Sequence, residues 1–137
     1  NQTTKAPVGT VATAPNLSIP QGGSNEKIVA AIMAEGERAY GSGKLVDARA
    51  FFDRAVKLDP NCERCVNRYD FLDRQITKEV DDAMAVGVTY MDNQRWDQAI
   101  RAFEKVMFLD PNPASVNNAT ATRFIEEAKQ KKAAGGR

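Results

Sequence analysis

Histidine is absent from the 137 residues of this chain, and cysteine occurs only twice. Without histidine, the chain lacks the commonest general base and the commonest transition-metal ligand. The haem-attachment pattern Cys-x-x-Cys-His is excluded as well, because Val66 follows Cys65. Net charge is also nearly absent, since 19 basic residues against 18 acidic ones leave a formal charge of +1. This balance gives no electrostatic reason to expect nucleic acid or an anionic membrane surface as a partner.

Long apolar runs and catalytic motifs are missing too. No window approaches the roughly 18 consecutive apolar residues of a membrane-spanning helix. The acidic pairs Asp81-Asp82 and Glu126-Glu127 are adjacent in sequence, so their carboxylates diverge on a helix. Calcium-loop spacing, a phosphate-binding glycine loop and a serine nucleophile elbow do not occur. We therefore expect no catalytic residue, no metal site and no cofactor, and we interpret the protein as a non-enzyme.

The first 25 residues, NQTTKAPVGTVATAPNLSIPQGGSN, have one charged residue, three prolines and no aromatic residue. Such a segment cannot bury enough apolar surface to offset its ordering entropy. We expect a disordered tether over 1–25, a helical domain over 26–133 and a disordered tail over 134–137. Tethers of this kind often link cell-envelope domains to an anchor. We therefore expect an extracytoplasmic location, in the periplasm or at the outer membrane as a lipoprotein with its lipid anchor upstream. A cytoplasmic arm of the same composition is the alternative.

An internal repeat organises the rest of the chain. The segment AVKLDPNC at 55–62 is echoed by VMFLDPNP at 106–113, which is an offset of 51 residues. The same offset aligns Gly36 with Gly87, Ala48 with Ala99, Phe52 with Phe103 and Pro60 with Pro111. In each copy, small residues allow two helices to approach and a phenylalanine fills the space below them. The Asp-Pro step ends the second helix, because proline disfavours helical geometry in the residue before it. The pattern predicts an all-α fold built from two helical hairpins.

The segment between the copies continues the helical pattern. Apolar residues recur at intervals of three and four from Val66 to Tyr90. We expect one long helix over about 62–92, whose first half packs on the first hairpin and whose second half opens the second. A break near Thr77 is the alternative. A further stripe after Pro113 predicts a C-terminal capping helix, which brings the total to about five helices.

These spacings resemble tetratricopeptide repeats (TPR). Each copy matches part of the family's pattern of Trp, Leu-Gly, Tyr, Ala, Phe and Pro. The first copy matches it at Gly36, Ala48, Phe52 and Pro60. The second copy matches it at Gly87, Tyr90, Ala99, Phe103 and Pro111. The chain departs from it at Ile32 and Ala83, where the family often has Trp, and at Ala39, where it has Tyr. The resemblance covers 29–62 and 80–113. The offset of 51 residues exceeds the family's usual repeat of about 34, so we interpret the difference as a 17-residue helical insertion.

In this family, the first helix of each hairpin lines a concave groove that binds peptides or helices. The resemblance therefore assigns partner binding to Met33, Glu37, Tyr40, Asp81, Met84, Val88 and Met91. Methionines beside acids suit an apolar helix or extended segment with basic flanks. The alternative is that the methionines belong to the core. The implied function is that of an adaptor or scaffold for protein–protein interaction, for example in a bacterial secretion or pilus complex.

Three other functions remain open from the sequence, and one of them is a thiol sensor that would depend on Cys62 and Cys65. A structural homo-oligomer would bury the same groove surface against a second copy. A peptidoglycan-binding or glycan-binding accessory protein would use exposed aromatic residues, for which the candidates are Tyr69, Phe71 and Phe108.

The cysteine pair, Cys62 and Cys65, is predicted to lie at the start of the long helix, where the helix dipole can make a thiol more reactive. A thioredoxin-type centre would need a β-α-β context, which the sequence lacks. A zinc site would need four ligands, which the two cysteines could complete only across a dimer or with carboxylates such as Glu63. The remaining interpretations are a local disulfide, which an extracytoplasmic location would favour, and free thiols with a structural role.

Overall fold

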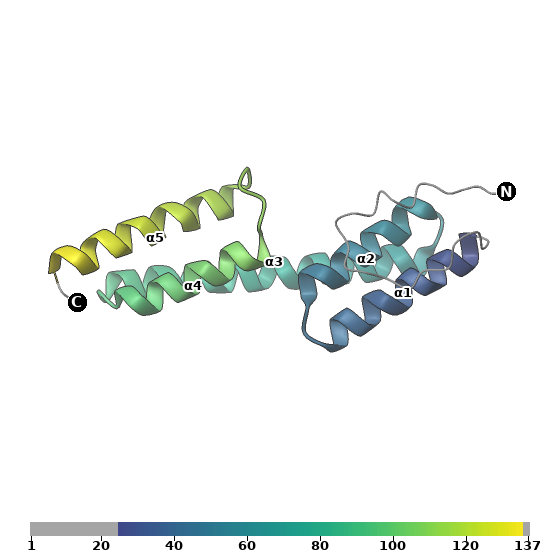
Figure 1. The fold of residues 1–137 in the computed structure, drawn as a ribbon, viewed down its shortest axis with the longest axis horizontal. Coiled ribbons are helices and arrows are strands. Elements are labelled where there is room, and N and C mark those ends of the chain that lie inside the picture. The colour runs from purple at the N-terminus through teal and green to yellow at the C-terminus, as the bar shows by residue number, and fades with distance from the viewer. Residues whose placement is uncertain (1–24, 136–137) are drawn as a thin grey trace. The chain divides into compact units, whose positions relative to one another are not determined.

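The computed structural model describes residues 25–135, and within that range the protein is all-α (Figure 1). The five helices are α1 (Asn25–Gly41), α2 (Leu45–Leu58), α3 (Glu63–Asp92), α4 (Trp96–Leu109) and α5 (Val116–Gly135). The predicted arrangement of helical hairpins, with a long central helix and a C-terminal helix, is confirmed. α3 runs for 30 residues without a break at Thr77.

The predicted domain ends differ slightly from the helix ends. Asn25 is already the first residue of α1, and α5 continues through Gly135, so the predicted tether and the predicted tail each overlap the end of a helix. The remainder of both segments, 1–24 and 136–137, lies outside the described residues.

One helical domain is expected from the sequence, whereas the chain divides into two compact units within α3. The first unit ends at Arg74 and the second begins at Gln75. The first half of α3 packs on the α1–α2 hairpin, whereas its second half forms the second hairpin with α4, so each half of α3 belongs to a different core.

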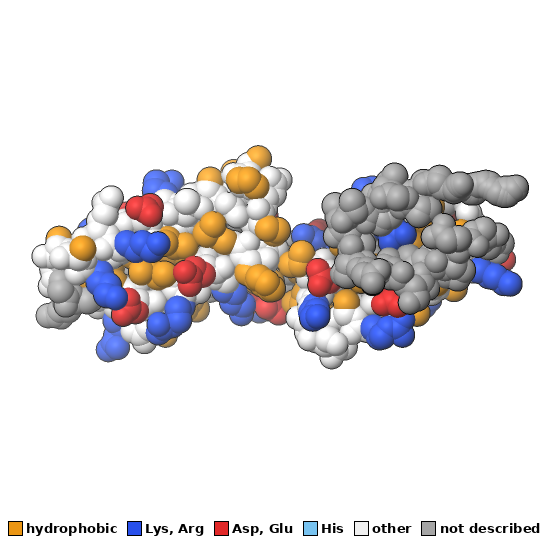
Figure 2. All heavy atoms as spheres, in the orientation of Figure 1, with side chains coloured by type: hydrophobic (Ala, Val, Ile, Leu, Met, Phe, Trp, Pro, Cys, Tyr) orange, Lys and Arg blue, Asp and Glu red, His pale blue; other side chains and the backbone are white. Residues whose placement is uncertain are grey.

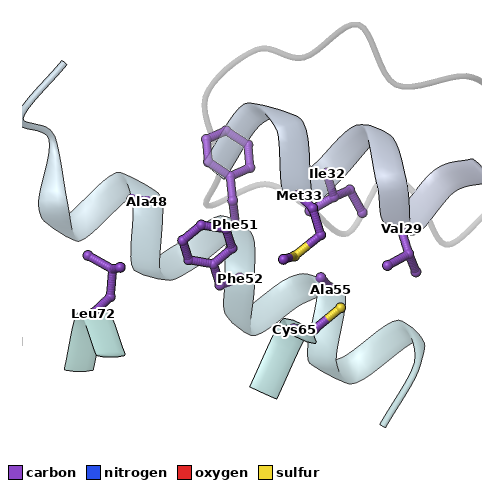
Figure 3. Close-up of a cluster of buried hydrophobic side chains, with 9 residues drawn as sticks. All are labelled: Val29, Ile32, Met33, Ala48, Phe51, Phe52, Ala55, Cys65 and Leu72. Carbon is purple, nitrogen blue, oxygen red and sulfur yellow. The ribbon is translucent and has the colours of Figure 1, made fainter. Parts of the chain in front are cut away.

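The core of the first unit combines residues from α1, α2 and the first half of α3 (Figure 3). Its fully buried members include Phe52, which fills the space beside Gly36. The cluster consists of Val29, Ile32, Met33, Ala48, Phe51, Phe52, Ala55, Cys65 and Leu72.

The core of the second unit is built on the same plan from the second half of α3, α4 and α5. Phe103 takes the place of Phe52 and lies beside Gly87, and its ring centroid is 5.2 Å from that of Phe124 on α5. The other buried apolar side chains are Ile76, Val80, Ala83, Trp96, Ala99, Val106, Leu109, Ala121, Ile125 and Ala128.

The two hairpin turns repeat each other at the 51-residue offset. Lys44 donates its backbone N–H to the carbonyl of Ala39, and Arg95 donates to that of Tyr90, both at 2.9 Å. The residue before each donor has a left-handed backbone, with φ of 78° at Gly43 and 60° at Gln94. Glycine adopts this conformation readily, whereas glutamine does so less often. The sequence repeat is therefore a repeat of structure.

A salt bridge joins the C-terminal part of α5 to the start of α4. Lys132 Nζ lies 2.7 Å from Asp97 Oδ1. The hydrogen bond from Lys132 lowers the pKa of the Asp97 carboxyl below its ordinary value, and the positive charges of Lys132 and Arg101 add to the effect. A carboxyl with a lowered folded-state pKa stabilises the fold at pH values above its ordinary pKa, and this stabilisation is lost as the pH falls through the lowered value.

We expect Lys132→Met to raise the titration midpoint of Asp97 back toward its ordinary value, because the hydrogen bond is removed. Carboxyl carbon chemical shifts followed by NMR between about pH 2 and pH 6 measure this midpoint. Lys129→Met, on the same helix, is the matched control and should leave the midpoint unchanged. An equal shift in both variants would contradict the assignment of the pKa change to Lys132.

Candidate functional site

The predicted groove of the first hairpin is occupied by the protein itself. Met33 is 1% exposed and points into the core cluster (Figure 3). The prediction that Met33 binds a partner is therefore wrong, and the alternative assignment to the core holds for this residue. The physical reason is that the first half of α3 packs on this hairpin and places Cys65 and Leu72 in the same cluster.

Glu37 and Tyr40, the other two predicted residues of this hairpin, also contact α3. Arg68 donates two hydrogen bonds to the Glu37 carboxylate, from Nε and from Nη2, each 2.8 Å long. The Arg68 guanidinium also lies over the rings of Tyr40, Phe52 and Phe71, at 5.1 to 5.4 Å from the ring centroids. These distances are typical of cation–π contacts. Arg68 thus closes this face of α1.

Arg68 is not among the site residues predicted from the sequence. Its only signal is its place in the inserted segment, one turn after Cys65 and one turn before Leu72, on the stripe that faces the first hairpin. A charged residue on an otherwise apolar stripe indicates a partly buried ion pair, but its partner on another helix cannot be read from spacing.

The second hairpin leaves the corresponding face accessible. Asp81, Met84, Val88 and Met91 follow one another at steps of three and four, so they share one stripe of α3. Val88 is 40% exposed, Asp81 is exposed, and the two methionines are half-buried. We call these four residues the α3 stripe. The structure therefore brings together all the residues that the sequence assigned to the second half of the groove.

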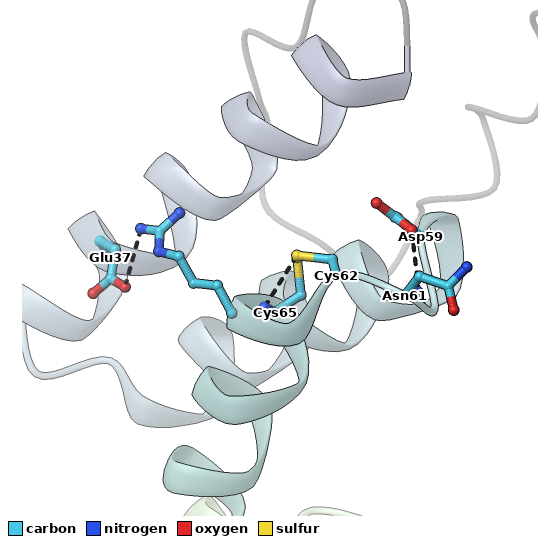
Figure 4. Close-up of a disulfide and its surroundings, with 6 residues drawn as sticks. Glu37, Asp59, Asn61, Cys62 and Cys65 are labelled. Atoms are coloured by element: carbon cyan, nitrogen blue, oxygen red, sulfur yellow. Dashed lines mark hydrogen bonds and ion pairs between the residues drawn. A yellow bond between two sulfur atoms is a disulfide. The ribbon is translucent and has the colours of Figure 1, made fainter.

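The cysteines form a disulfide at the start of α3 (Figure 4). Of the sequence-based alternatives, the structure thus contains the local disulfide. The backbone N–H of Cys65 lies 3.1 Å from Cys62 Sγ. At the start of α5, the backbone N–H of Asn118 donates to Ser115 Oγ at the same distance of 3.1 Å. Both contacts are those of an N-cap side chain with the third residue of a helix.

These two caps align the start of α3 in the first unit with the start of α5 in the second unit. Cys62 corresponds to Ser115 and Cys65 to Asn118, at an offset of 53 residues. The offset grows from 51 to 53 because the α4–α5 linker, 110–115, is two residues longer than the α2–α3 linker, 59–62. By the same offset, Ala121 on α5 corresponds to Arg68 on α3.

This correspondence explains why the two faces differ. In the first unit, Arg68 binds Glu37 across the helix pair. In the second unit, Val88 stands where the first has Glu37, and Ala121 stands where the first has Arg68. A valine and an alanine cannot form this ion pair, and Val88 remains 40% exposed. The α3 stripe thus lacks the ion pair that links the equivalent face of the first unit to α3.

The aromatic residues considered for glycan binding do not form one cluster. Tyr69 and Phe71 lie in the first unit, where Phe71 packs edge-on against Tyr40 with ring centroids 5.9 Å apart. Phe108 lies in the second unit and is 72% exposed. The structure does not gather the three residues within either unit.

Within residues 25–135, no group of three or more His, Cys, Asp and Glu side chains is placed to hold a metal ion. None of the described helices combines the length and the hydropathy needed to cross a membrane. Comparison with family models, with curated proteins and with solved structures finds no match to this chain.

Proposed function

We propose that the protein is a non-catalytic adaptor whose second unit binds a partner segment on the α3 stripe. One observation carries this proposal. Asp81, Met84, Val88 and Met91 form an accessible, mostly apolar stripe, whereas on the equivalent face of the first unit Met33 is buried and Glu37 and Tyr40 contact Arg68 of α3. An apolar stripe left open at one of two equivalent places needs a further explanation, and a partner segment supplies it.

The first unit indicates what such a segment looks like. In that unit, α3 packs on the equivalent face with Leu72, Phe71 and Arg68. The second unit replaces the acid Glu37 with Val88 and the aromatic Tyr40 with Met91. The methionine side chains are flexible and polarisable, so they adapt to apolar side chains of different shapes. We therefore propose an apolar helix or extended peptide as the occupant.

Acidic residues at both ends of the stripe favour basic flanks on the partner. Asp81 and Asp92 are exposed, and neither forms a salt bridge in the part of the chain that the structure describes. Opposite charges at the rim of an interface raise the association rate and select the orientation of the partner. Binding should therefore weaken as salt concentration increases.

The family and the location belong to the same proposal. The matching turns and glycine–phenylalanine contacts of the two hairpins support the identification of TPR-like repeats. The Cys62–Cys65 disulfide supports an extracytoplasmic location, because disulfides persist in oxidising compartments. We propose that the adaptor works in a cell-envelope assembly such as a secretion or pilus complex.

The test is affinity capture from the native source, followed by measurement of Kd with the captured partner. We expect Val88→Glu to weaken binding by at least about tenfold, because it places an unpaired charge in an apolar contact. Val86→Glu is the matched control, since Val86 is 46% exposed on the same helix but lies outside the stripe. Equal affinity of both variants for the partner would overturn the proposal.

A structural homo-oligomer is the second candidate, and it has its own observation. In the second unit, Phe108 and Val116 are 72% and 80% exposed. The corresponding positions in the first unit are Lys57 and Glu63, so the fold does not require apolar residues there. Figure 2 shows hydrophobic side chains at the surface over α4 and α5. Light scattering across a range of protein concentrations separates the candidates, because only self-association makes the mass depend on concentration.

A further inference from the structure

The two cysteines of the disulfide differ in how deeply they are buried. Cys65 is fully buried in the core of the first unit, in the same cluster as Met33 and Ala55 (Figure 3). Cys62 is only partly buried, at the position before the first residue of α3. The side of the disulfide that faces solvent is therefore that of Cys62. We propose that Cys62–Cys65 is an exchange-competent disulfide that accepts two electrons from a dithiol, with Cys62 as the sulfur that is attacked.

The second unit shows that the fold does not need this covalent bond. At the start of α5, Ser115 and Asn118 occupy the same cap positions without sulfur chemistry. Asn118 adds a hydrogen bond from Nδ2 to the carbonyl of Asp110, which ties the helix start to the end of α4. The disulfide also closes only a short ring, with a sequence separation of 3, so it constrains the unfolded chain little. A role beyond holding the turn is therefore left for it.

The exchange proceeds in two balanced steps. In the first, one thiolate of the dithiol attacks Cys62 Sγ and forms a mixed disulfide. The Cys62–Cys65 bond breaks, and its electron pair goes to Cys65 Sγ, which takes up a proton. In the second, the other thiol of the dithiol loses its proton and attacks its neighbour's sulfur, which releases Cys62 as a thiolate that is then protonated. The dithiol leaves as a disulfide. Two electrons and two protons have then passed to Cys62 and Cys65.

The structure also favours Cys62 as the thiolate released in the second step. The backbone N–H of Cys65 lies 3.1 Å from Cys62 Sγ, so it can donate a hydrogen bond to the sulfur anion. The position at the N-terminus of a 30-residue helix adds the favourable end of the helix dipole. Because Ser115 occupies the equivalent position with an oxygen, the reduced form can keep the same cap through Cys62.

The test uses the full chain and two single-cysteine variants. Cys65→Ser leaves the accessible Cys62, and Cys62→Ser leaves the buried Cys65. We expect iodoacetamide to alkylate Cys62 at least about tenfold faster than Cys65 in the folded proteins, and the rates to become equal in denaturant. Cys65→Ala replaces Cys65→Ser if circular dichroism shows that the serine variant is unfolded. Equal rates in the folded variants would overturn the assignment of Cys62 as the attacked sulfur.

The wild-type chain supplies the second measurement. With dithiothreitol as the dithiol, we expect the disulfide to be reduced under native conditions while the helical circular dichroism is retained. Mass spectrometry after quenching with acid counts the free thiols. Reduction that occurs only where the helical signal is lost would overturn the proposal, because the disulfide would then be purely structural.

Discussion

Replacing Gly87 with alanine is expected to destabilise the second unit by about 1–3 kcal/mol, which is the usual effect of overpacking a core. A Cβ atom at this position would lie 2.5 Å from Cε1 of Phe103. The ring cannot move aside freely, because Phe103 is fully buried and its other neighbour is Phe124, with ring centroids 5.2 Å apart. The loss should outweigh the roughly 1 kcal/mol by which alanine is the better helix former.

Denaturant unfolding of the two variants Gly87→Ala and Gly41→Ala measures this effect. Gly41 is the control because it also lies in a helix, at the end of α1, and a Cβ there would have no atom within 4 Å. We expect Gly41→Ala to be neutral or to stabilise the protein by up to about 1 kcal/mol. Gly36→Ala should behave like Gly87→Ala, since its Cβ would clash with Phe52. If Gly87→Ala were as stable as Gly41→Ala, the close approach of α3 and α4 would be contradicted.

Replacing Arg68 with alanine should destabilise the first unit by roughly 2–3 kcal/mol, given the usual strength of hydrogen bonds to charged groups and of cation–π contacts. The substitution removes both hydrogen bonds to Glu37 and the contacts with three aromatic rings. It also leaves the Glu37 carboxylate half-buried without its main partner. The Arg68 and Glu37 side chains are 25% and 37% exposed, so water screens their interaction in part. The expected loss of stability for Arg68→Ala already includes this screening.

Arg64→Ala is the matched control for this prediction. Arg64 lies one turn earlier on the same helix and faces the same carboxylate, but at 3.9 Å and with 65% of its side chain exposed. Its removal should change the free energy of unfolding by less than about 0.5 kcal/mol. The loss of unfolding free energy in Arg68→Lys should lie between those of Arg64→Ala and Arg68→Ala. The lysine ammonium group keeps the positive charge but lacks the planar guanidinium that donates two parallel hydrogen bonds. Equal losses for Arg64→Ala and Arg68→Ala would show that only general charge attraction acts on Glu37.

The candidate site was half predictable from the sequence. The helical period placed Asp81, Met84, Val88 and Met91 on one stripe, and the structure agrees. The same period placed Met33, Glu37 and Tyr40 on the equivalent stripe of α1, but Met33 is in the core. A hydrophobic period tells which residues share a face of a helix. It does not tell whether another part of the chain covers that face.

The helices themselves depended on local features. Proline at positions 60 and 111, small residues at 36 and 87, and the spacing of apolar residues were enough to predict five helices and their order. These features act within a few residues, because backbone geometry, capping and side-chain spacing are properties of one helix or turn. For the same reason, the 51-residue repeat in the sequence is also present in the structure, as matching turns and matching glycine–phenylalanine contacts.

Tertiary structure decided the features on which function rests. It pairs Arg68 with Glu37 over a separation of 31 residues, divides the chain between Arg74 and Gln75, and buries Cys65 while Cys62 stays partly accessible. Each of these depends on which helix packs on which face, and that choice is a balance of many contacts between residues distant in sequence. The result is one closed face and one open face made from two similar hairpins.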